Sequence, residues 1–306
     1  MRFLLLVTIY LILPKSNLSA QDSAEALYDK AYRYLSVDKA KAIELLSQTI
    51  EADSTHADAH FHRGITYFKL GQFDSALSDF KVAYDLKPNN TLLLMYQGFA
   101  YRNLGDIQKA MQSFSKYISL NPTDTSAYSY VLRGKMKYEL GDFDGAVADY
   151  DLASKLRPYR EKYNYYKFVA YRDAGNLDKA LQTASNLINS NPDFYGYYFY
   201  KGQLFQELQQ YDSAVFMYNI AVIKNYQNAD SYYYRGQSYQ RLNEHEKALE
   251  DLNTAIELNE KEGAYYSSRG NIKQHLGNLS GACADWNEAG RLGYYEDFDK
   301  IKEVCN

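Results

Sequence analysis

The chain has 306 residues, of which 46% are hydrophobic, and a net charge of −4 at neutral pH. This apolar content is sufficient for a buried core, so general disorder is excluded. Lysine and arginine form no runs and are outnumbered by aspartate and glutamate, which disfavours nucleic acid as a partner.

Residues 1–20 have the layout of a secretory signal peptide. Arg2 precedes an apolar run from Phe3 to Leu13, and a polar stretch then ends at Ala20. The apolar run is shorter than the ~20 residues that a transmembrane helix needs, although an uncleaved N-terminal anchor is the alternative. No cysteine lies near Ala20, which excludes a lipoprotein signal. We therefore expect an exported protein, periplasmic or secreted, with no integral membrane span once the signal is removed.

The rest of the chain repeats with a period of 34 residues, apart from one interval of 36. Eight alanines mark this period: Ala42, Ala76, Ala110, Ala146, Ala180, Ala214, Ala248 and Ala282. Glycines and prolines follow the same spacing. The region is therefore built from copies of one structural repeat.

Residues 57–90 illustrate the first half of a repeat. Between His60 and Tyr67, apolar and aromatic residues recur at intervals of three and four, which predicts a helix. We expect Gly71 to end this helix, because a left-handed residue after a helix is least costly as glycine.

A second helix is predicted after this turn. Asp74 is placed to cap its start, and Pro88 ends it because proline cannot continue a helix. Gly64 in the first helix and Ala76 in the second are small, so the two helices can approach closely. The repeat is therefore a helix hairpin.

These residues follow a pattern that resembles the tetratricopeptide repeat. The pattern is G-x-x-Y-x-x-x-G-x-[FY]-x-x-A-x-x-x-[FY]-x-x-A-x-x-x-x-P, and residues 57–90 match it throughout. The resemblance implies an all-α fold, an α-solenoid of about eight tetratricopeptide hairpins in a right-handed superhelix. The array spans 21–296, and its repeats are 23–56, 57–90, 91–126, 127–160, 161–194, 195–228, 229–262 and 263–296. A capping helix is expected over residues 296–306.

The repeat at 161–194 departs from this pattern. Phe168 stands where the other complete repeats have glycine, and Ala184 stands where most have a large ring. These two changes could conserve the volume between the helices, so the hairpin would survive with a shifted helix angle. The alternative is a locally loose repeat.

Signals for chemistry are weak. His56, His60 and His62 suggest a metal site, but no cysteine is near and His60 occupies a core-packing position, so no metal is expected. Residues 142–151 faintly resemble a calcium loop but lack its third alternating ligand, which favours an ordinary repeat turn. No nucleophile signature, acid–base pair or phosphate loop is present. We expect neither enzymatic activity nor a cofactor.

Cys283 and Cys305 are the only cysteines, and both lie near the C-terminus. An even number in an exported chain permits a disulfide, and two separate thiols are the alternative. We predict the disulfide. The C-terminal sequence resembles the closing repeat of exported bacterial tetratricopeptide repeat proteins, which implies a bacterial, periplasmic-type setting.

The family resemblance also implies a binding groove formed by the first helices of the repeats. The positions that face inward in the family correspond here to Phe61, Ile65, Phe68, Met95, Phe99, Arg102, Tyr128, Lys135, Tyr138, Tyr165, Arg172, Phe199 and Tyr233. The later repeats place polar residues there: Gln203, Gln206, Gln237, Gln240, Arg241, Asn271 and Gln274. Partner binding is expected to depend most on residues 57–172, where large apolar side chains and cations coincide.

Three functions follow from this reading. The leading hypothesis is a non-catalytic scaffold or adaptor of the cell envelope or periplasm, which holds a segment of a partner protein in the groove. The alternative is a glycan- or peptidoglycan-associated binding protein that uses the half lined by tyrosine and glutamine. A structural spacer without a groove ligand is the third. The sequence identifies neither the partner nor the oligomeric state.

Overall fold

The computed structural model describes residues 15–122, 127–296 and 298–305. Regular structure in these residues is entirely helical and comprises seventeen helices. The chain divides into two compact units, residues 1–156 and residues 157–306, and each has its own buried core. We call them the N-terminal unit and the C-terminal unit.

The described part of the N-terminal unit contains α1 (Lys15–Tyr34), α2 (Lys39–Ala52), α3 (Ala57–Lys69), α4 (Phe73–Leu86), α5 (Leu92–Asn103), α6 (Ile107–Leu120), α7 (Tyr128–Glu139) and α8 (Phe143–Leu156). That of the C-terminal unit contains α9 (Glu161–Asp173), α10 (Leu177–Ser190), α11 (Tyr195–Glu207), α12 (Tyr211–Lys224), α13 (Ala229–Arg241), α14 (His245–Leu258), α15 (Gly263–His275), α16 (Leu279–Arg291) and α17 (Phe298–Val304).

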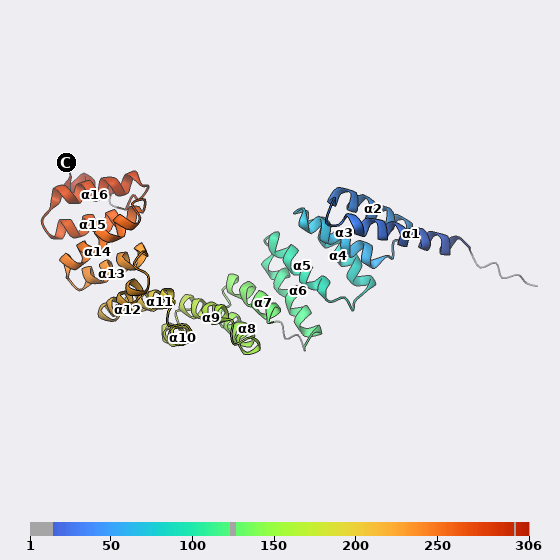
Figure 1. Ribbon diagram of the computed structural model, residues 1–306, viewed down its shortest axis with the longest axis horizontal. Helices are drawn as coiled ribbons and strands as arrows, with labels where there is room; N and C mark the ends of the chain where they lie inside the picture. The colour runs from blue at the N-terminus through green and yellow to red at the C-terminus, as the bar shows by residue number, and fades with distance from the viewer. Residues whose placement is uncertain (1–14, 123–126, 297, 306) are drawn as a thin grey trace, which may run out of the picture. The chain divides into compact units, whose positions relative to one another are not determined.

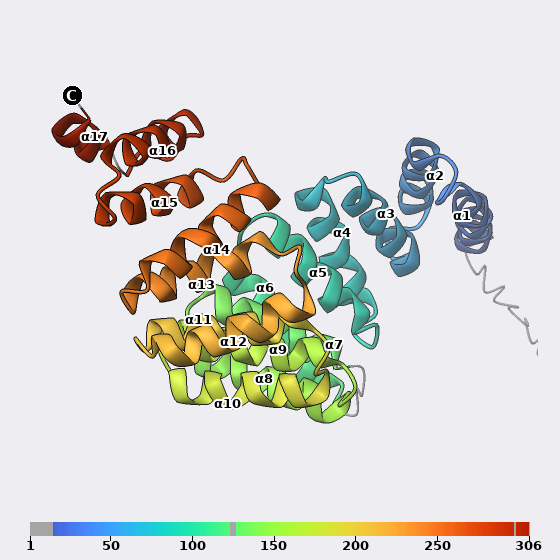
Figure 2. The same ribbon diagram turned by 60° about the vertical axis from the view of Figure 1, so that its left-hand side comes forward.

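The helices form consecutive hairpins. Odd-numbered helices up to α15 are the first helices of the repeats, and even-numbered helices are the second helices. Within each unit, every helix packs against the helices before and after it (Figures 1 and 2). Some first helices of neighbouring repeats also meet: α3 meets α5, and α13 meets both α11 and α15. The fold is therefore an all-α solenoid of hairpins, as the sequence predicted.

A tight left-handed turn joins the two helices of a hairpin. Gly71 has a φ of +77°, and its N–H donates to the carbonyl of Phe68 at 3.0 Å. This geometry satisfies a carbonyl at the end of α3, as predicted for glycine at this position. Gln209 and Asn243 take the same conformation in the sixth and seventh repeats, which lack the glycine, with φ of 58° and 60°.

The second helix of the repeat at 57–90 begins two residues earlier than the prediction assumed. α4 starts at Phe73 with Gln72 as its N-cap, so Asp74 lies inside the first turn and does not cap the helix. In α6 the residue at the N-cap position is Asp106, and its carboxylate accepts from the backbone N–H of Lys109 at 3.1 Å. The expected cap at Asp74 is therefore wrong, although a carboxylate in the first turn still favours the helix dipole.

The two helices of a hairpin meet where a small residue faces a large one. A Cβ atom at Gly64 would lie only 2.7 Å from the ring of Phe80. The fifth repeat reverses this arrangement: Phe168 and Ala184 occupy the corresponding positions, and each is 1% exposed. The exchange conserves a filled core. The burial of both side chains favours this exchange over a locally loose repeat.

The two ends of the array differ. α17 packs against α16, as expected of a capping helix. The predicted signal peptide lies outside the described residues as far as residue 14, and residues 15–20 belong to α1. None of the helices in the described ranges combines the length and apolar character that a membrane span requires.

Candidate binding surface

The predicted groove residues of the N-terminal unit are largely used for packing. Met95 is 7% exposed and belongs to the core around Phe114, so it is not available to a partner, which corrects the prediction. Phe61, Ile65 and Phe68 are half-buried and pack against the core of the hairpin α3–α4. Neighbouring first helices approach closely, and these side chains fill the space between them.

Three of the predicted groove rings pack edge-on against a ring of their own hairpin. Phe68 meets a ring of α4 with 5.4 Å between the centroids, and Tyr138 meets a ring of α8 at 5.4 Å. Phe99 meets a ring of α6 at 5.5 Å. Edge-to-face contacts of this kind add to the free energy of burial, so these rings stabilise the hairpins.

The remaining groove positions of the N-terminal unit are more open. Tyr128 is 50% exposed, and Lys135 is half-buried. Arg102 is exposed and lies 3.9 Å from the carboxylate of Glu139. These three side chains do not gather into a described cavity.

The predicted groove residues of the C-terminal unit have mixed roles. Tyr165 packs against the buried core of α9–α11, and Phe199 lies edge-on to a tyrosine of α13 at 5.4 Å. The Nε of Arg172 donates to Asp173 at 2.9 Å. Tyr233 differs from these three because it lines a cavity.

This cavity, which we call the polar cavity, has a volume of about 510 Å³ and lies in the C-terminal unit. Its walls come from α13, α15, the loop before α14 and the C-terminal segment. It is lined by Tyr233, Gln237, Gln240, Arg241, Asn243, His245, Ser267, Ser268, Asn271, His275, Tyr294, Glu296 and Lys300. A neighbouring cavity of about 200 Å³ shares three of these residues and adds Gln206 and Tyr211. The volume is in the range of small-molecule sites, but the lining is polar.

The sequence identified only part of this lining. Tyr233, Gln237, Gln240, Arg241 and Asn271 were placed in the groove by family register. Of the others, Ser267, Ser268 and His275 lie on α15, itself a first helix, and were overlooked there. The rest come from the turn before α14, the start of α14 and the C-terminal segment, which the inward positions of the first helices do not include.

Hydrogen bonds fix several side chains in the polar cavity. The Nε2 of Gln237 donates to the hydroxyl of Tyr233 at 2.7 Å, and burial raises the pKa of that tyrosine. The Nζ of Lys300 donates to the Oδ1 of Asn271 at 2.7 Å. By contrast, the structure shows no hydrogen bond or ion pair for the Arg241 guanidinium among the described residues.

Two histidines stack in the same wall. The rings of His245 and His275 are nearly parallel, with 5.1 Å between their centroids. The Nδ1 of His245 is buried and has no hydrogen-bond partner among the described residues. The wall therefore offers a buried polar atom in addition to its amides and hydroxyls.

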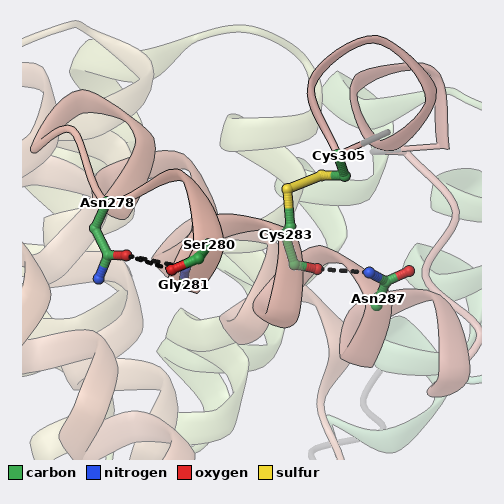
Figure 3. Close-up of a disulfide and its surroundings, with 6 residues drawn as sticks. All are labelled: Asn278, Ser280, Gly281, Cys283, Asn287 and Cys305. Carbon is green, nitrogen blue, oxygen red and sulfur yellow. Dashed lines mark hydrogen bonds between the residues drawn. A yellow bond between two sulfur atoms is a disulfide. The ribbon is translucent and has the colours of Figure 1, made fainter.

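A disulfide anchors the segment that closes the polar cavity. Cys283 on α16 is bonded to Cys305, which directly follows α17, and their Cα atoms are 5.6 Å apart (Figure 3). The two ends are separated by 22 residues, and the chain between them carries Tyr294, Glu296 and Lys300 of the lining. The bond thus holds one wall of the cavity against the last hairpin.

A buried ion pair recurs in four repeats and was not recognised in the sequence. The Arg63 side chain donates to both carboxylate oxygens of Asp79 at 2.8 Å, joining the first helix to the second. The same pairs, always sixteen residues apart, are Arg133–Asp149, Arg235–Asp251 and Arg269–Asp285. The spacing is visible in the printed sequence, so the pattern could have been found there.

The ion pair and a neighbouring histidine lower the pKa of Asp79 in the second repeat. Burial would raise the pKa of Asp79, but hydrogen bonds from Arg63 and His60 outweigh burial and lower that pKa. His60 lies 3.0 Å from the same carboxylate.

The three clustered histidines are engaged separately. His60 contacts Asp79, His56 accepts from the backbone N–H of Ala59, and His62 packs against tyrosine rings. In the described ranges, no three potential ligands gather for a metal.

The repeats match known family models. Models described as tetratricopeptide repeat match residues 57–90, 97–124, 127–160 and 229–262. The chain is a tetratricopeptide repeat protein. Nothing among the curated proteins matches the sequence.

Solved structures with the same fold are similar over most of this tetratricopeptide repeat protein. The C-terminal part of a repeat-containing protein from Cytophaga hutchinsonii shares 16% identity at a TM-score of 0.63, covering 81% of this chain and 98% of that one. A tetratricopeptide repeat protein from Parabacteroides merdae shares 21% identity at 0.55, covering 81% and 96%. A chain in the APC/C hetero-tetramer Cut9–Hcn1 shares 14% at 0.51, covering 95% and 55%. These similarities establish the fold, and the repeats support a protein-interaction scaffold.

Proposed function

We propose that this protein is a non-catalytic scaffold of the cell envelope or periplasm, which holds an extended segment of a partner protein in the polar cavity. The observation that carries the proposal is the lining of that cavity. Side-chain amides both donate and accept hydrogen bonds, so Gln237, Gln240 and Asn271 match the alternating N–H and C=O groups of an extended peptide. Arg241 adds a cation with no partner among the described side chains.

This site differs from the one expected from the sequence. The large apolar side chains of residues 57–172 mostly stabilise hairpins, so they are poor candidates for the main contact surface. Export is supported by the signal-like residues 1–20, and a disulfide is typical of oxidising compartments. Both features are consistent with an envelope location.

A glycan is the second candidate ligand. The polar cavity combines two tyrosine rings, Tyr233 and Tyr294, with amide and hydroxyl side chains. An aromatic ring can cover the apolar face of a sugar while amides bind its hydroxyl groups.

Parallel binding assays on peptide and glycan arrays distinguish the two candidates. We expect the full-length chain to bind extended peptides. The double variant Gln240→Ala with Arg241→Ala should bind them about tenfold more weakly, because these two side chains supply central polar contacts. Arg33→Ala with Gln108→Ala, at exposed positions of the N-terminal unit, serves as the matched control and should bind normally. Binding of glycans alone would favour the second candidate. Peptide binding that does not change in the Gln240/Arg241 variant would refute the proposed site.

A further inference from the structure

The third repeat lacks the buried ion pair. The position of Arg63 is occupied by Gln97, and the position of Asp79 is occupied by Ser113. The hydroxyl of Ser113 donates to the backbone carbonyl of Lys109 in its own helix at 2.9 Å. The junction between α5 and α6 therefore has neither the guanidinium nor the carboxylate that joins the helices of the second repeat.

In three of the four ion-pair junctions the preceding second helix contributes a third residue. This residue is an uncharged acceptor. Ser47 accepts from Arg63 at 3.0 Å, and Asn219 and Asn253 accept from the arginines of their junctions at 2.8 Å. In the third repeat the corresponding residue is Lys81. The positive charge has moved to the preceding helix, and the carboxylate that would balance it is missing.

A cavity of about 520 Å³ lies at this altered junction, and we call it the lysine cavity. It is lined by residues of α4, α5 and α6: Leu77, Ser78, Lys81, Tyr84, Asp85, Leu94, Gln97, Tyr101, Lys109, Gln112, Ser113 and Lys116. Three lysines thus face a single carboxylate. All of these residues lie within the N-terminal unit.

Two of these lysines lack a carboxylate partner in the part of the chain that the structure describes. Lys109 is bonded to Asp106 at 2.7 Å. The ammonium of Lys116 lies 4.5 Å from the ring centroid of Tyr84, and Lys81 has no hydrogen bond or ion pair with a described residue. Local positive charge on a chain of net charge −4 favours an anion at this cavity.

We propose that the lysine cavity binds an acidic peptide segment, whose carboxylate is held by Lys81 and Lys116. The carboxylate takes the role that Asp79 has in the second repeat. The cavity is much larger than one carboxylate, and Leu77 and Leu94 in its wall can contact the apolar stem of the acidic side chain and its neighbours. A peptide therefore fits better than a small inorganic anion.

This site is separate from the surface formed by the first helices. The predicted groove residues of α5 are Met95, Phe99 and Arg102. The cavity uses Leu94, Gln97 and Tyr101, which lie on a different side of the same helix. The proposal is thus independent of the polar cavity in the C-terminal unit.

Isothermal titration of the full-length chain tests this site. The probes are a terminally capped hexaglutamate peptide, free glutamate and inorganic phosphate, each at low and high salt. We expect the peptide to bind at least about tenfold more tightly than either small anion, because neighbouring carboxylates share one chain. Its affinity should fall at high salt, because the lysines are exposed.

Charge variants locate the site. Lys81→Gln with Lys116→Gln should weaken the peptide about tenfold, since both cations are removed. Lys39→Gln with Lys69→Gln removes the same charge from exposed positions of the same unit and should change binding less than about twofold. Circular dichroism verifies the fold of each variant, and Gln240→Ala with Arg241→Ala should leave this binding unchanged.

Three results would overturn the proposal. One is an absence of peptide binding to the wild-type chain. Another is equal loss of affinity in the two lysine variants, which would indicate general attraction to the protein. The third is phosphate or free glutamate binding as tightly as the peptide, which would indicate a small-anion site.

Discussion

Asp79 is only 3% exposed, and its carboxylate is held by Arg63 and His60. Removing one partner of such a buried pair leaves the other charge uncompensated in a region with little water. The free energy of unfolding therefore falls by more than it does when a surface ion pair is broken. The arginine also donates to Ser47 of the preceding repeat at 3.0 Å. A single side chain therefore connects three helices of two hairpins.

Replacing the buried carboxylate should destabilise the N-terminal unit. We expect Asp79→Asn to lower the free energy of unfolding by about 3 kcal/mol, because Arg63 loses its partner. Asp74→Asn on the exposed first turn of the same helix is the control, and it should cost less than about 1 kcal/mol. Urea unfolding measures both. Equal costs for the two variants would contradict this role.

The same pair predicts a pH dependence. Because the folded-state pKa of Asp79 lies below its unfolded value, the stabilisation is complete above the unfolded pKa of about 4. It is lost as the pH falls through the folded pKa. Urea titrations between pH 7 and pH 3 should therefore show a steeper loss for the wild-type chain than for Asp79→Asn.

At the scale of the helices, the hairpins from the second repeat onward share a contact between a small and a large residue. In the second repeat the small residue is Gly64 on the first helix and the large one is Phe80 on the second. In the fifth repeat the large residue is Phe168 on α9 and the small one is Ala184 on α10. The two solutions fill a similar space from opposite sides.

Exchanging the fifth pair tests this reciprocity. Phe168→Gly alone should cost about 3–5 kcal/mol by leaving a cavity, and Ala184→Phe alone about 1–3 kcal/mol by overpacking. The double variant should be destabilised by at least about 2 kcal/mol less than the sum of the two single costs. Urea unfolding measures the free energy of each variant. The control is Phe168→Gly with Ala180→Phe, which adds a ring at another buried alanine and should show no such gain. Additive costs in the exchanged pair would rule out the reciprocal contact.

The hairpins were predictable from the sequence because a 34-residue period repeats their local signals many times. Positions such as Gly71 also have a conformational reason that needs no tertiary information. The groove was predicted less well, because family register places Met95 inward without indicating how closely the neighbouring helices approach. The polar cavity includes Lys300, which only the folded C-terminal segment brings to α15. The position of a residue within the 34-residue repeat does not reveal this contact.

At the scale of the whole molecule, stability is expected to be local. Each helix packs mainly against its sequence neighbours, and the chain divides into two units with separate cores. In such arrays the loss of one contact acts on the nearest repeats first. The Cys283–Cys305 bond therefore concerns the last hairpin and the wall of the polar cavity.

Removing the disulfide should loosen the C-terminus without affecting the N-terminal unit. We expect Cys283→Ala with Cys305→Ala to lose about 3 kcal/mol of local stability, the chain-entropy value for a loop of this length. Hydrogen exchange should accelerate in α16 and α17 and remain unchanged in α1–α8. Exchange that accelerates equally throughout the chain would show that the array unfolds as one body.

The reversed pair of the fifth repeat also distinguishes correct from incorrect helix pairing during folding. First helices that carry glycine at the contact can accept a ring from the second helix of more than one repeat, so repeats of similar sequence compete as partners. α9 presents Phe168 instead, and it would bring ring against ring with a second helix such as α12, which carries Tyr218 at this contact. α10, with Ala184, would leave a void against a first helix that carries glycine. α9 avoids the clash with α10, and α10 avoids the void with α9, so this hairpin favours its own pairing in an array whose other members resemble one another.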